Sequence, residues 1–177
     1  MVNSGSSANL LSLAILTNPK FSKKLNSGDE VITPALTWST TVYPMVNNGL
    51  KPVFVDVDPE TFCLDENKIE EAITKKTKAI MPVSLYGQPA DMDAIQAIAD
   101  KYNLKVIIDG AQSFGSTFNK KTDSNLDDIS TTSFFPSKPL GCYGDGGAVF
   151  TNNEDYAKKI KLLRVHGQNK RYHHQYI

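Results

Sequence analysis

One lysine in this sequence has neighbours that a surface lysine does not need. Lys138 lies in the stretch SFFPSKPLGCYGDGGAVF, residues 133–150, between two prolines and directly before a glycine-rich segment. A residue that precedes proline is pushed out of helical dihedrals, so we expect Lys138 to be extended and on a loop. Glycines let the backbone approach a ligand closely. Most lysines are simply solvated, but the flanking phenylalanines predict partial burial and a nucleophilic amine.

A second candidate group lies in KVIIDGAQSFGS. Asp109 ends a short apolar run, at the point where α/β sheets gather their ligands, and Gln112 follows three residues later. A carboxylate at a strand end is about as often only a helix cap. Its functional alternative is to hold a proton on a heteroaromatic nitrogen, because a charged hydrogen bond is strong in a low dielectric.

The third candidate is the segment NSGSSANLLSLAIL near the amino terminus. Four small residues, 4–7, precede an apolar helical pattern, and hydroxyl residues at such a point usually serve as an N-cap. The same free amides, together with the helix dipole, can bind a phosphate group. The pattern is neither GxGxxG nor a Walker loop, and it lacks the acidic residue expected of a dinucleotide site.

Taken together, these groups match what pyridoxal phosphate requires. They supply an imine partner, a partner for the pyridine nitrogen and a phosphate cradle. Trp38, the only tryptophan, follows another strand and is either a core or edge aromatic or a residue that stacks on a flat ring. His166, His173 and His174 lack a cysteine or carboxylate cluster, so we predict no metal site but a polar rim or a subunit contact.

These groups need a scaffold, and the hydrophobic pattern predicts an α/β layer with a mostly parallel central sheet flanked by helices. Short β-branched runs predict strands that are covered on both faces, and amphipathic segments alternate with them. The predicted strands are residues 30–33, 52–57, 78–83, 105–109, 130–135 and 147–151, and the predicted helices are 8–16, 65–73, 91–102 and 154–165. We see no repeat or linker, so we expect one domain.

Composition excludes several other classes. The chain has 177 residues, 40% of them hydrophobic and 21% charged, and a formal net charge of zero. Balanced charge argues against non-specific nucleic-acid binding, and no apolar run reaches the ~20 residues of a membrane span. The start lacks a signal-peptide pattern. Cys63 and Cys142 are far apart and predict free thiols in a reducing compartment, so we expect a cytoplasmic protein.

The motifs also resemble a known family. NSGSSANL, GDEVITPALTW, KPVFVDVDPETF, YGQPADMDAI, VIIDGAQSFGS and SFFPSKPLGCYGDGGAVFT are similar to the DegT/DnrJ/EryC1/StrS group of nucleotide-sugar aminotransferases, fold-type I pyridoxal-phosphate enzymes. The resemblance runs through essentially the whole chain. The aspartate-glutamine and lysine-glycine motifs are specific to this group.

The resemblance implies a role for each candidate residue. Lys138 would bind pyridoxal 5'-phosphate covalently and Asp109 would pair with its ring nitrogen, while Gln112 would lie beside its 3-hydroxyl. Trp38 matches the aromatic residue that covers the ring. The phosphate contacts would come from Ser6, Ser7 and Ser133.

It also implies a substrate and an assembly. The sequence around Lys138 and RVHGQNKRYHH is most similar to enzymes that aminate the 3-keto position of a UDP-linked hexosaminuronic acid in lipopolysaccharide biosynthesis, with L-glutamate as the usual amino donor. Relatives are homodimers that begin before Met1 and continue into a smaller carboxyl-terminal domain. We therefore expect residues 1–177 to be the cofactor-binding large domain, incomplete at both ends.

Two alternatives stay open. SGSSANLL in the first third is more similar to a sister branch, the deoxysugar 3-dehydratases, which use the same cofactor but have histidine in place of the lysine. Lys138 therefore favours the aminotransferase. The second alternative is a truncated chain that keeps the fold without binding the cofactor.

Overall fold

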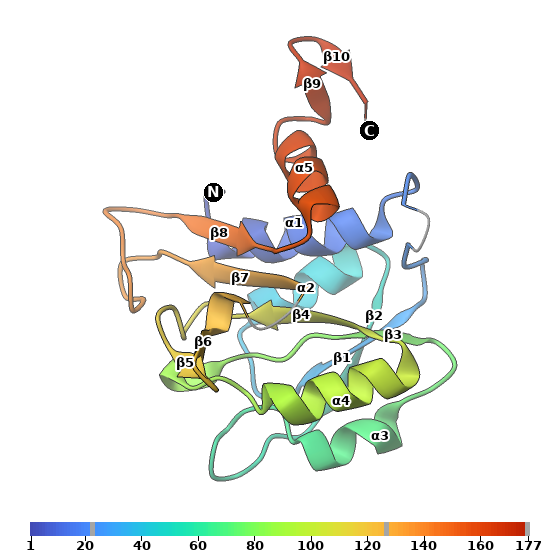
Figure 1. The fold of residues 1–177 in the computed structure, drawn as a ribbon, viewed down its shortest axis with the longest axis vertical. Coiled ribbons are helices and arrows are strands. Elements are labelled where there is room, and N and C mark those ends of the chain that lie inside the picture. Colours follow the sequence, from blue (N-terminus) through green and yellow to red (C-terminus); the bar gives the residue numbers. More distant parts are fainter. Residues whose placement is uncertain (22–23, 126–127, 176–177) are drawn as a thin grey trace.

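The computed structural model describes residues 1–21, 24–125 and 128–175. Within these residues, the strands form one central sheet in the order β2-β1-β3-β4-β7-β8 and two small hairpins (Figure 1). The first five central strands pair in parallel, and β8 pairs with β7 in the antiparallel direction. The bounds are β1 Glu30–Pro34, β2 Lys51–Val55, β3 Thr77–Ile80, β4 Lys105–Asp109, β7 Ile129–Ser133 and β8 Gly147–Phe150. The predicted α/β layer with a mostly parallel sheet is confirmed.

Helices cover both faces of this sheet. On one face lie α1 (Gly5–Thr17), α2 (Ser39–Asn47) and α5 (Glu154–Leu163), and on the other lie α3 (Ile69–Ala72) and α4 (Met92–Tyr102) (Figure 1). Neighbouring residues of one strand serve opposite faces, because side chains alternate along a strand. Ile107 of β4 packs with α1 and Ile108 packs with α4, and both are fully buried. This two-sided burial explains why the strands have almost continuous apolar sequences.

Several predicted boundaries need correction. The strand predicted over 52–57 ends at Val55, and the one predicted over 78–83 ends at Ile80. The helix predicted over 65–73 is a 3₁₀ turn, Glu66–Lys68, followed by the short helix α3. The helix predicted to reach residue 165 ends at Leu163. The whole of α2 was not predicted, because it contains Pro44 and three residues with low helix propensity near its start.

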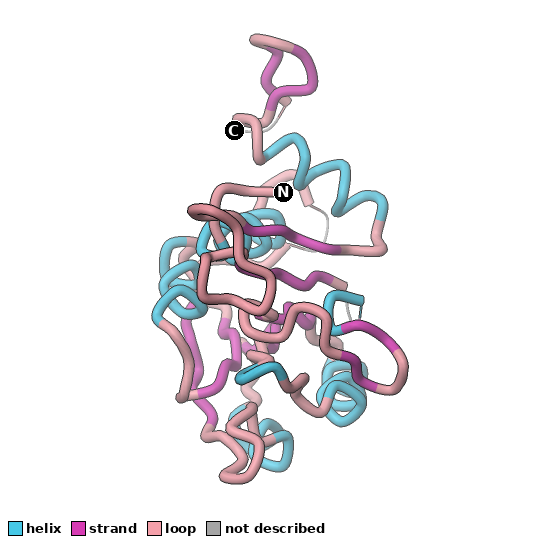
Figure 2. Tube along the Cα trace, turned by 90° about the vertical axis from the view of Figure 1, so that its left-hand side faces the viewer, coloured by secondary structure: helices cyan, strands magenta, loops and turns pink. Residues whose placement is uncertain are grey.

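The smaller elements lie at the margins of the sheet. Two hairpins were not predicted, β5 (Thr117–Phe118) with β6 (Lys121–Thr122) and β9 (Gln168–Lys170) with β10 (His173–His174). The second hairpin projects beyond α5 and away from the sheet (Figures 1 and 2). Two further 3₁₀ turns are η2 (Leu85–Gly87) and η3 (Asp123–Asn125). In the described part of the chain, no helix is long and apolar enough to cross a membrane.

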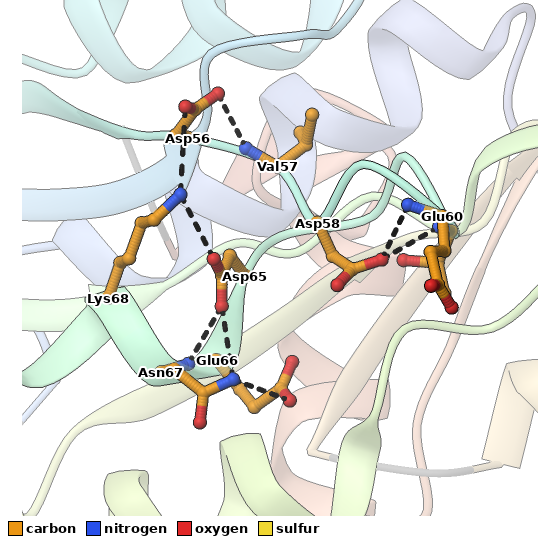
Figure 3. A network of polar contacts seen from close by, with 9 residues as sticks. Asp56, Val57, Asp58, Glu60, Asp65, Glu66, Asn67 and Lys68 are labelled. Carbon is orange, nitrogen blue, oxygen red and sulfur yellow. Dashed lines mark hydrogen bonds and ion pairs between the residues drawn. The ribbon is translucent and has the colours of Figure 1, made fainter.

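A polar network closes the connection between β2 and α3 (Figure 3). Lys68 Nζ lies 3.1 Å from an Asp65 oxygen and 3.7 Å from an Asp56 oxygen. Asp65 also accepts the amide of Asn67, which caps the turn that leads into α3. The hydrogen bond that Lys68 donates to Asp65 holds the pKa of Lys68 above its ordinary value. This network fixes the loop that carries Phe62 toward the carboxyl edge of the sheet.

Candidate active site

A cavity of about 480 Å³ lies at the carboxyl edge of the parallel strands. Its walls are the segments that follow β1, β3, β4 and β7, together with the first turns of α1 and α2. Parallel sheets bring the ends of distant strands together at one edge, so segments more than 100 residues apart share this cavity. Six of the seven predicted site residues line it: Ser6, Trp38, Asp109, Gln112, Ser133 and Lys138.

Asp109 is the last residue of β4, and its side chain is only 3% exposed. Its Oδ2 accepts hydrogen bonds from Asn9 Nδ2 and Thr41 Oγ1, each at 2.8 Å. Its Oδ1 accepts the backbone amide of Ala111 at 3.2 Å. These donors are all neutral, and Asn9 and Thr41 were not predicted. Their one signal in the sequence is a polar residue on the apolar face of α1 and a threonine close to Trp38.

Gln112 is half-buried and follows Asp109 within the same turn of chain. Its Oε1 accepts the backbone amide of Tyr86 at 3.0 Å, which ties the β4 loop to the β3 loop. Tyr86 has a positive φ of 55°, an uncommon conformation for a tyrosine. Its ring packs edge-on against Phe62 at 6.2 Å between centroids. The side-chain amide of Gln112 is therefore held by a loop that is itself supported by the β2–α3 connection.

Lys138 lies in the loop between β7 and β8, as expected, and is half-buried. A turn positions it, because its backbone amide donates to Phe135 O at 2.9 Å. Gly141 permits this turn, since a Cβ at that position would lie 2.4 Å from Pro136 O. The two flanking aromatics differ: Phe134 is 9% exposed and packs against Phe114, but Phe135 is 49% exposed at the cavity. The predicted partial burial of Lys138 is confirmed.

The first turn of α1 forms the wall opposite these loops. Ser4 is the N-cap, and its Oγ accepts the amide of Ser7 at 3.1 Å. Gly5 packs directly on β7, because a Cβ there would lie 2.6 Å from Ser133 Cβ. Ser6 and Ser133 line the cavity, whereas Ser7 is not among the described residues that do so. The hydroxyl of Ser7 instead accepts a hydrogen bond from Ser4.

Trp38 is the residue before α2, and it lines the cavity with 73% of its surface exposed. The alternative that it is a core aromatic is therefore wrong. Charged residues are few here: among the described residues that line the cavity they are Asp109, Lys138 and Asp145. Asp145 is exposed and was not predicted.

The three histidines do not share this location. His166 precedes the β9–β10 hairpin and the other two form β10, and in the described part of the chain none of the three lines the cavity. The alternative that they form a rim of this cavity is wrong, and the alternative that they form a subunit contact stays a prediction. No group of three or more potential metal ligands occurs among the residues that the structure describes.

A second buried carboxylate lies close to the cavity. Asp123 is 2% exposed and accepts hydrogen bonds from Ser84 Oγ at 2.9 Å and from Ser113 Oγ. Burial raises the pKa of Asp123 above its ordinary value, more than the two hydroxyl donors lower it. Ser84 opens the loop that carries Tyr86, and Ser113 follows Gln112. Asp123 therefore joins the two loops that hold the Gln112 side chain.

The fold and the cavity define an α/β protein with a lysine, a buried aspartate and a helix N-terminus around one site. Comparison with known proteins gives the family. The profile of the DegT/DnrJ/EryC1/StrS aminotransferase family matches residues 1–177, and the chain belongs to this family.

Individual relatives give further detail. The chain is 58% identical over 147 residues to UDP-2-acetamido-2-deoxy-3-oxo-D-glucuronate aminotransferase of Pseudomonas aeruginosa, covering 83% of this chain and 41% of the relative. It is 48% identical over 143 residues to 3-oxo-glucose-6-phosphate:glutamate aminotransferase of Bacillus subtilis, covering 81% and 32%.

Among solved structures, E. coli GDP-4-keto-6-deoxy-D-mannose-3-dehydratase with bound hydrated PLP superposes with a TM-score of 0.90 at 37% identity, covering 97% of this chain and 43% of that one. The chain thus spans about two fifths or less of the length of these relatives.

Proposed function

We propose that this chain is the cofactor-binding large domain of a pyridoxal-phosphate-dependent aminotransferase. The observation that carries the proposal is that Lys138, Asp109 and the first turn of α1 line one cavity of about 480 Å³. An amine, a buried carboxylate and a helix N-terminus are the groups that this cofactor needs. That the rest of such an enzyme includes a smaller carboxyl-terminal domain stays a prediction from the sequence.

The residues present fit the cofactor. Asp109 is buried among neutral donors, so a protonated ring nitrogen would supply the missing positive charge. When bound, pyridoxal phosphate supplies a ring that accepts electrons from the carbon next to the substrate nitrogen. Lys138 Nζ would hold the cofactor and would then move the proton at that carbon. Asp109 would keep the ring nitrogen protonated, Gln112 would contact the 3-hydroxyl, and Trp38 would stack on the ring. Ser6, Ser133 and the amides of the first turn of α1 would hold the phosphate, whereas Ser7, whose hydroxyl accepts from Ser4, is not among the described residues that line the cavity.

We propose a keto sugar nucleotide as the amino acceptor, in the biosynthesis of a surface polysaccharide. The name of the Pseudomonas aeruginosa relative supports a UDP-linked 3-oxo sugar acid, and that of the Bacillus subtilis relative supports glutamate as the donor. We further propose a cytoplasmic homodimer. The exposed aromatic side chains of Trp38, Tyr86 and Phe135 on the cavity loops support an assembly that covers them.

A second candidate function is a 3-dehydratase, which the similarity to the E. coli enzyme supports. Both candidates use the same cofactor, so the cavity alone does not separate them. Lys138 favours amination, because the resemblance implies histidine at this position in dehydratases. A keto sugar nucleotide with L-glutamate distinguishes the two, since only the aminotransferase keeps the donated nitrogen in the product and forms an amino sugar, whereas the dehydratase forms a deoxysugar.

The first prediction concerns the covalent role of Lys138. The chain with added pyridoxal phosphate should develop a visible absorption band, and borohydride should fix the cofactor on Lys138 as a stable secondary amine that mass spectrometry of peptides locates. Lys138→Ala should lose the band and the label and reduce turnover by more than about 10³-fold.

The matched control is Lys170→Ala, which removes an exposed lysine of β9 outside the cavity and should keep both the band and the label. Label on another lysine, or unchanged transamination by Lys138→Ala, would contradict the assignment. A chain without any band or label would support the non-catalytic alternative instead.

A further inference from the structure

Asn9 is a buried amide in a place where the helical pattern requires an apolar residue. It lies on the face of α1 that also presents Ala8, Leu13 and Leu16 to the sheet, and it is only 2% exposed. A buried amide is costly unless its donors and acceptor are paired. Packing alone would be served better by leucine, so the amide indicates a requirement for its hydrogen bonds.

The hydrogen bonds of Asn9 connect four elements. Its Nδ2 donates to Asp109 Oδ2 at 2.8 Å and to Thr40 O at 3.1 Å, and its Oδ1 accepts from Thr131 Oγ1 at 2.6 Å. A carboxylate can only accept, so the nitrogen of the amide must face Asp109. The amide oxygen of Asn9 then faces the other way and accepts the hydrogen bond from the hydroxyl of Thr131. The side chain is therefore locked in one orientation by partners on α2, β4 and β7.

Thr41 makes the second fixed contact to the same carboxylate oxygen. It is 1% exposed and donates to Asp109 Oδ2 at 2.8 Å. Its oxygen lies 2.7 Å from Thr37 Oγ1. Because the single proton of Thr41 is used on Asp109, Thr37 is the donor in this second contact. Thr37 thus donates to Thr41, and Thr41 and Asn9 each donate to Oδ2.

These contacts leave Asp109 as a buried carboxylate that is held in one orientation. The hydrogen bonds recorded for it among the described residues come from neutral groups, and Oδ1 accepts only one backbone amide, at 3.2 Å. Neutral donors stabilise a carboxylate without cancelling its charge. A cationic group that enters the cavity would therefore be attracted by an uncompensated carboxylate in a low dielectric. The orientation of that charge depends on Asn9.

We propose that Asn9, together with Thr41, is a positioning residue that acts through Asp109. It holds this carboxylate in the orientation in which it would meet the protonated ring nitrogen of the cofactor. The inference rests on the proposed function, because it assigns the ring nitrogen as the partner of Asp109. This role differs from a packing role in one measurable respect. Asn9 should strengthen the binding of pyridoxal phosphate only when the ring of the ligand contains a nitrogen.

The test compares two ligands on two proteins. Pyridoxal phosphate and its 1-deaza analogue, in which carbon replaces the ring nitrogen, are titrated into the wild-type chain and into Asn9→Leu, with binding read from visible absorbance. Leucine has the same branching and the same number of side-chain heavy atoms as asparagine, and it removes the donors. We expect Asn9→Leu to weaken pyridoxal phosphate about 10- to 100-fold, the value of a hydrogen bond to a charged group. The deaza analogue should change by less than about 3-fold.

Each other outcome is decisive. An equal loss with both ligands would show that Asn9 only supports the packing of α1, and it would overturn the inference while the proposed function stands. A wild-type chain that fails to bind pyridoxal phosphate at all would overturn the proposed function itself.

A second pair of variants covers the case in which Asn9→Leu does not fold. Thr41→Val removes the hydroxyl at nearly constant volume, whereas Thr41→Ser keeps it. Circular dichroism checks the fold of each variant. Thr41→Val should lose affinity for pyridoxal phosphate and not for the deaza analogue, and Thr41→Ser should restore most of the affinity. A loss shared by Val and Ser, or by both ligands, would overturn the inference.

Discussion

At the scale of single residues, Asp123 makes stability depend on pH. Burial raises its pKa above the ordinary value of 3.8, with the charge of Asp109 adding to the effect. A group whose pKa is higher in the folded state binds more protons there than in the unfolded chain, so its contribution to stability is present below pH 3.8 and is lost as the pH rises through the folded pKa. Asp123→Asn removes this titration. We expect the free energy of unfolding of wild type, minus that of Asp123→Asn, to fall as the pH rises above 3.8.

Urea denaturation of both proteins at several pH values from the acid range to neutrality measures this difference. A difference that grew with pH would show that the two serine hydroxyls stabilise the charged form more than burial destabilises it. Asp123 would then be an anion in the folded chain at neutral pH.

The candidate site residues differ in how far the sequence could predict them. Lys138 and Asp109 stand beside proline, glycine and a strand end, which are local signals, and they line one cavity as the prediction requires. Asn9 and Thr41 have only a weak signal, a polar residue on an apolar helix face and a threonine near Trp38, because the role of each depends on a contact to Asp109, 100 and 68 residues away. Asp123 was missed for the same reason. A polar side chain that serves another side chain is visible only after the chain has folded.

At the scale of elements, α1 packs closely against β7 at Gly5. A methyl group on Gly5 would lie 2.6 Å from Ser133 Cβ, so α1 or β7 would have to shift. Alanine is preferred over glycine in a helix by up to about 1 kcal/mol, but overpacking of this kind costs about 1–3 kcal/mol. We expect Gly5→Ala to lower the free energy of unfolding by about 1–2 kcal/mol.

Thermal or urea denaturation measures the effect. Ser7→Ala, in the same turn but outside the described cavity lining, is the control and should change the free energy of unfolding by only about 0.5 kcal/mol. A stabilised Gly5→Ala protein would mean that the backbone adjusts freely at this contact. The first turn of α1 would then not be fixed by β7.

Helices and strands whose hydrophobic residues repeat with a clear period were predicted, and those without such a repeat were not. β4 has the predicted bounds, and α4 begins one residue later than predicted, because a continuous β-branched run and a regular apolar face are clear patterns. α2 has Pro44 in its interior and threonines in its first turn, so tertiary packing against β2 and α1 overrides its propensity. The two hairpins have strands of two or three residues, too short for any period to show.

At the scale of the whole molecule, the sheet separates two cores that share its central strands. One contains Ile107 with residues of α1, α2 and α5, and the other contains Ile108 with residues of α3 and α4. Both side chains belong to β4, so β4 is part of both cores. If either core lost its packing, β4 would lose its support on that face, and the other core would be destabilised as well. We expect Ile107→Ala and Ile108→Ala each to lower the free energy of unfolding by about 2–5 kcal/mol.

The same reasoning predicts that each variant unfolds in one transition. Near-ultraviolet and far-ultraviolet circular dichroism should give the same midpoint in urea for both variants, as for wild type. If Ile108→Ala lost the α3–α4 side first, the two signals would separate, and the two cores would be independent. A common midpoint means instead that the cavity, which is built from strands of both cores, is assembled or lost with the whole fold. Cofactor binding, which acts only on the folded state, would then raise the stability of both cores together.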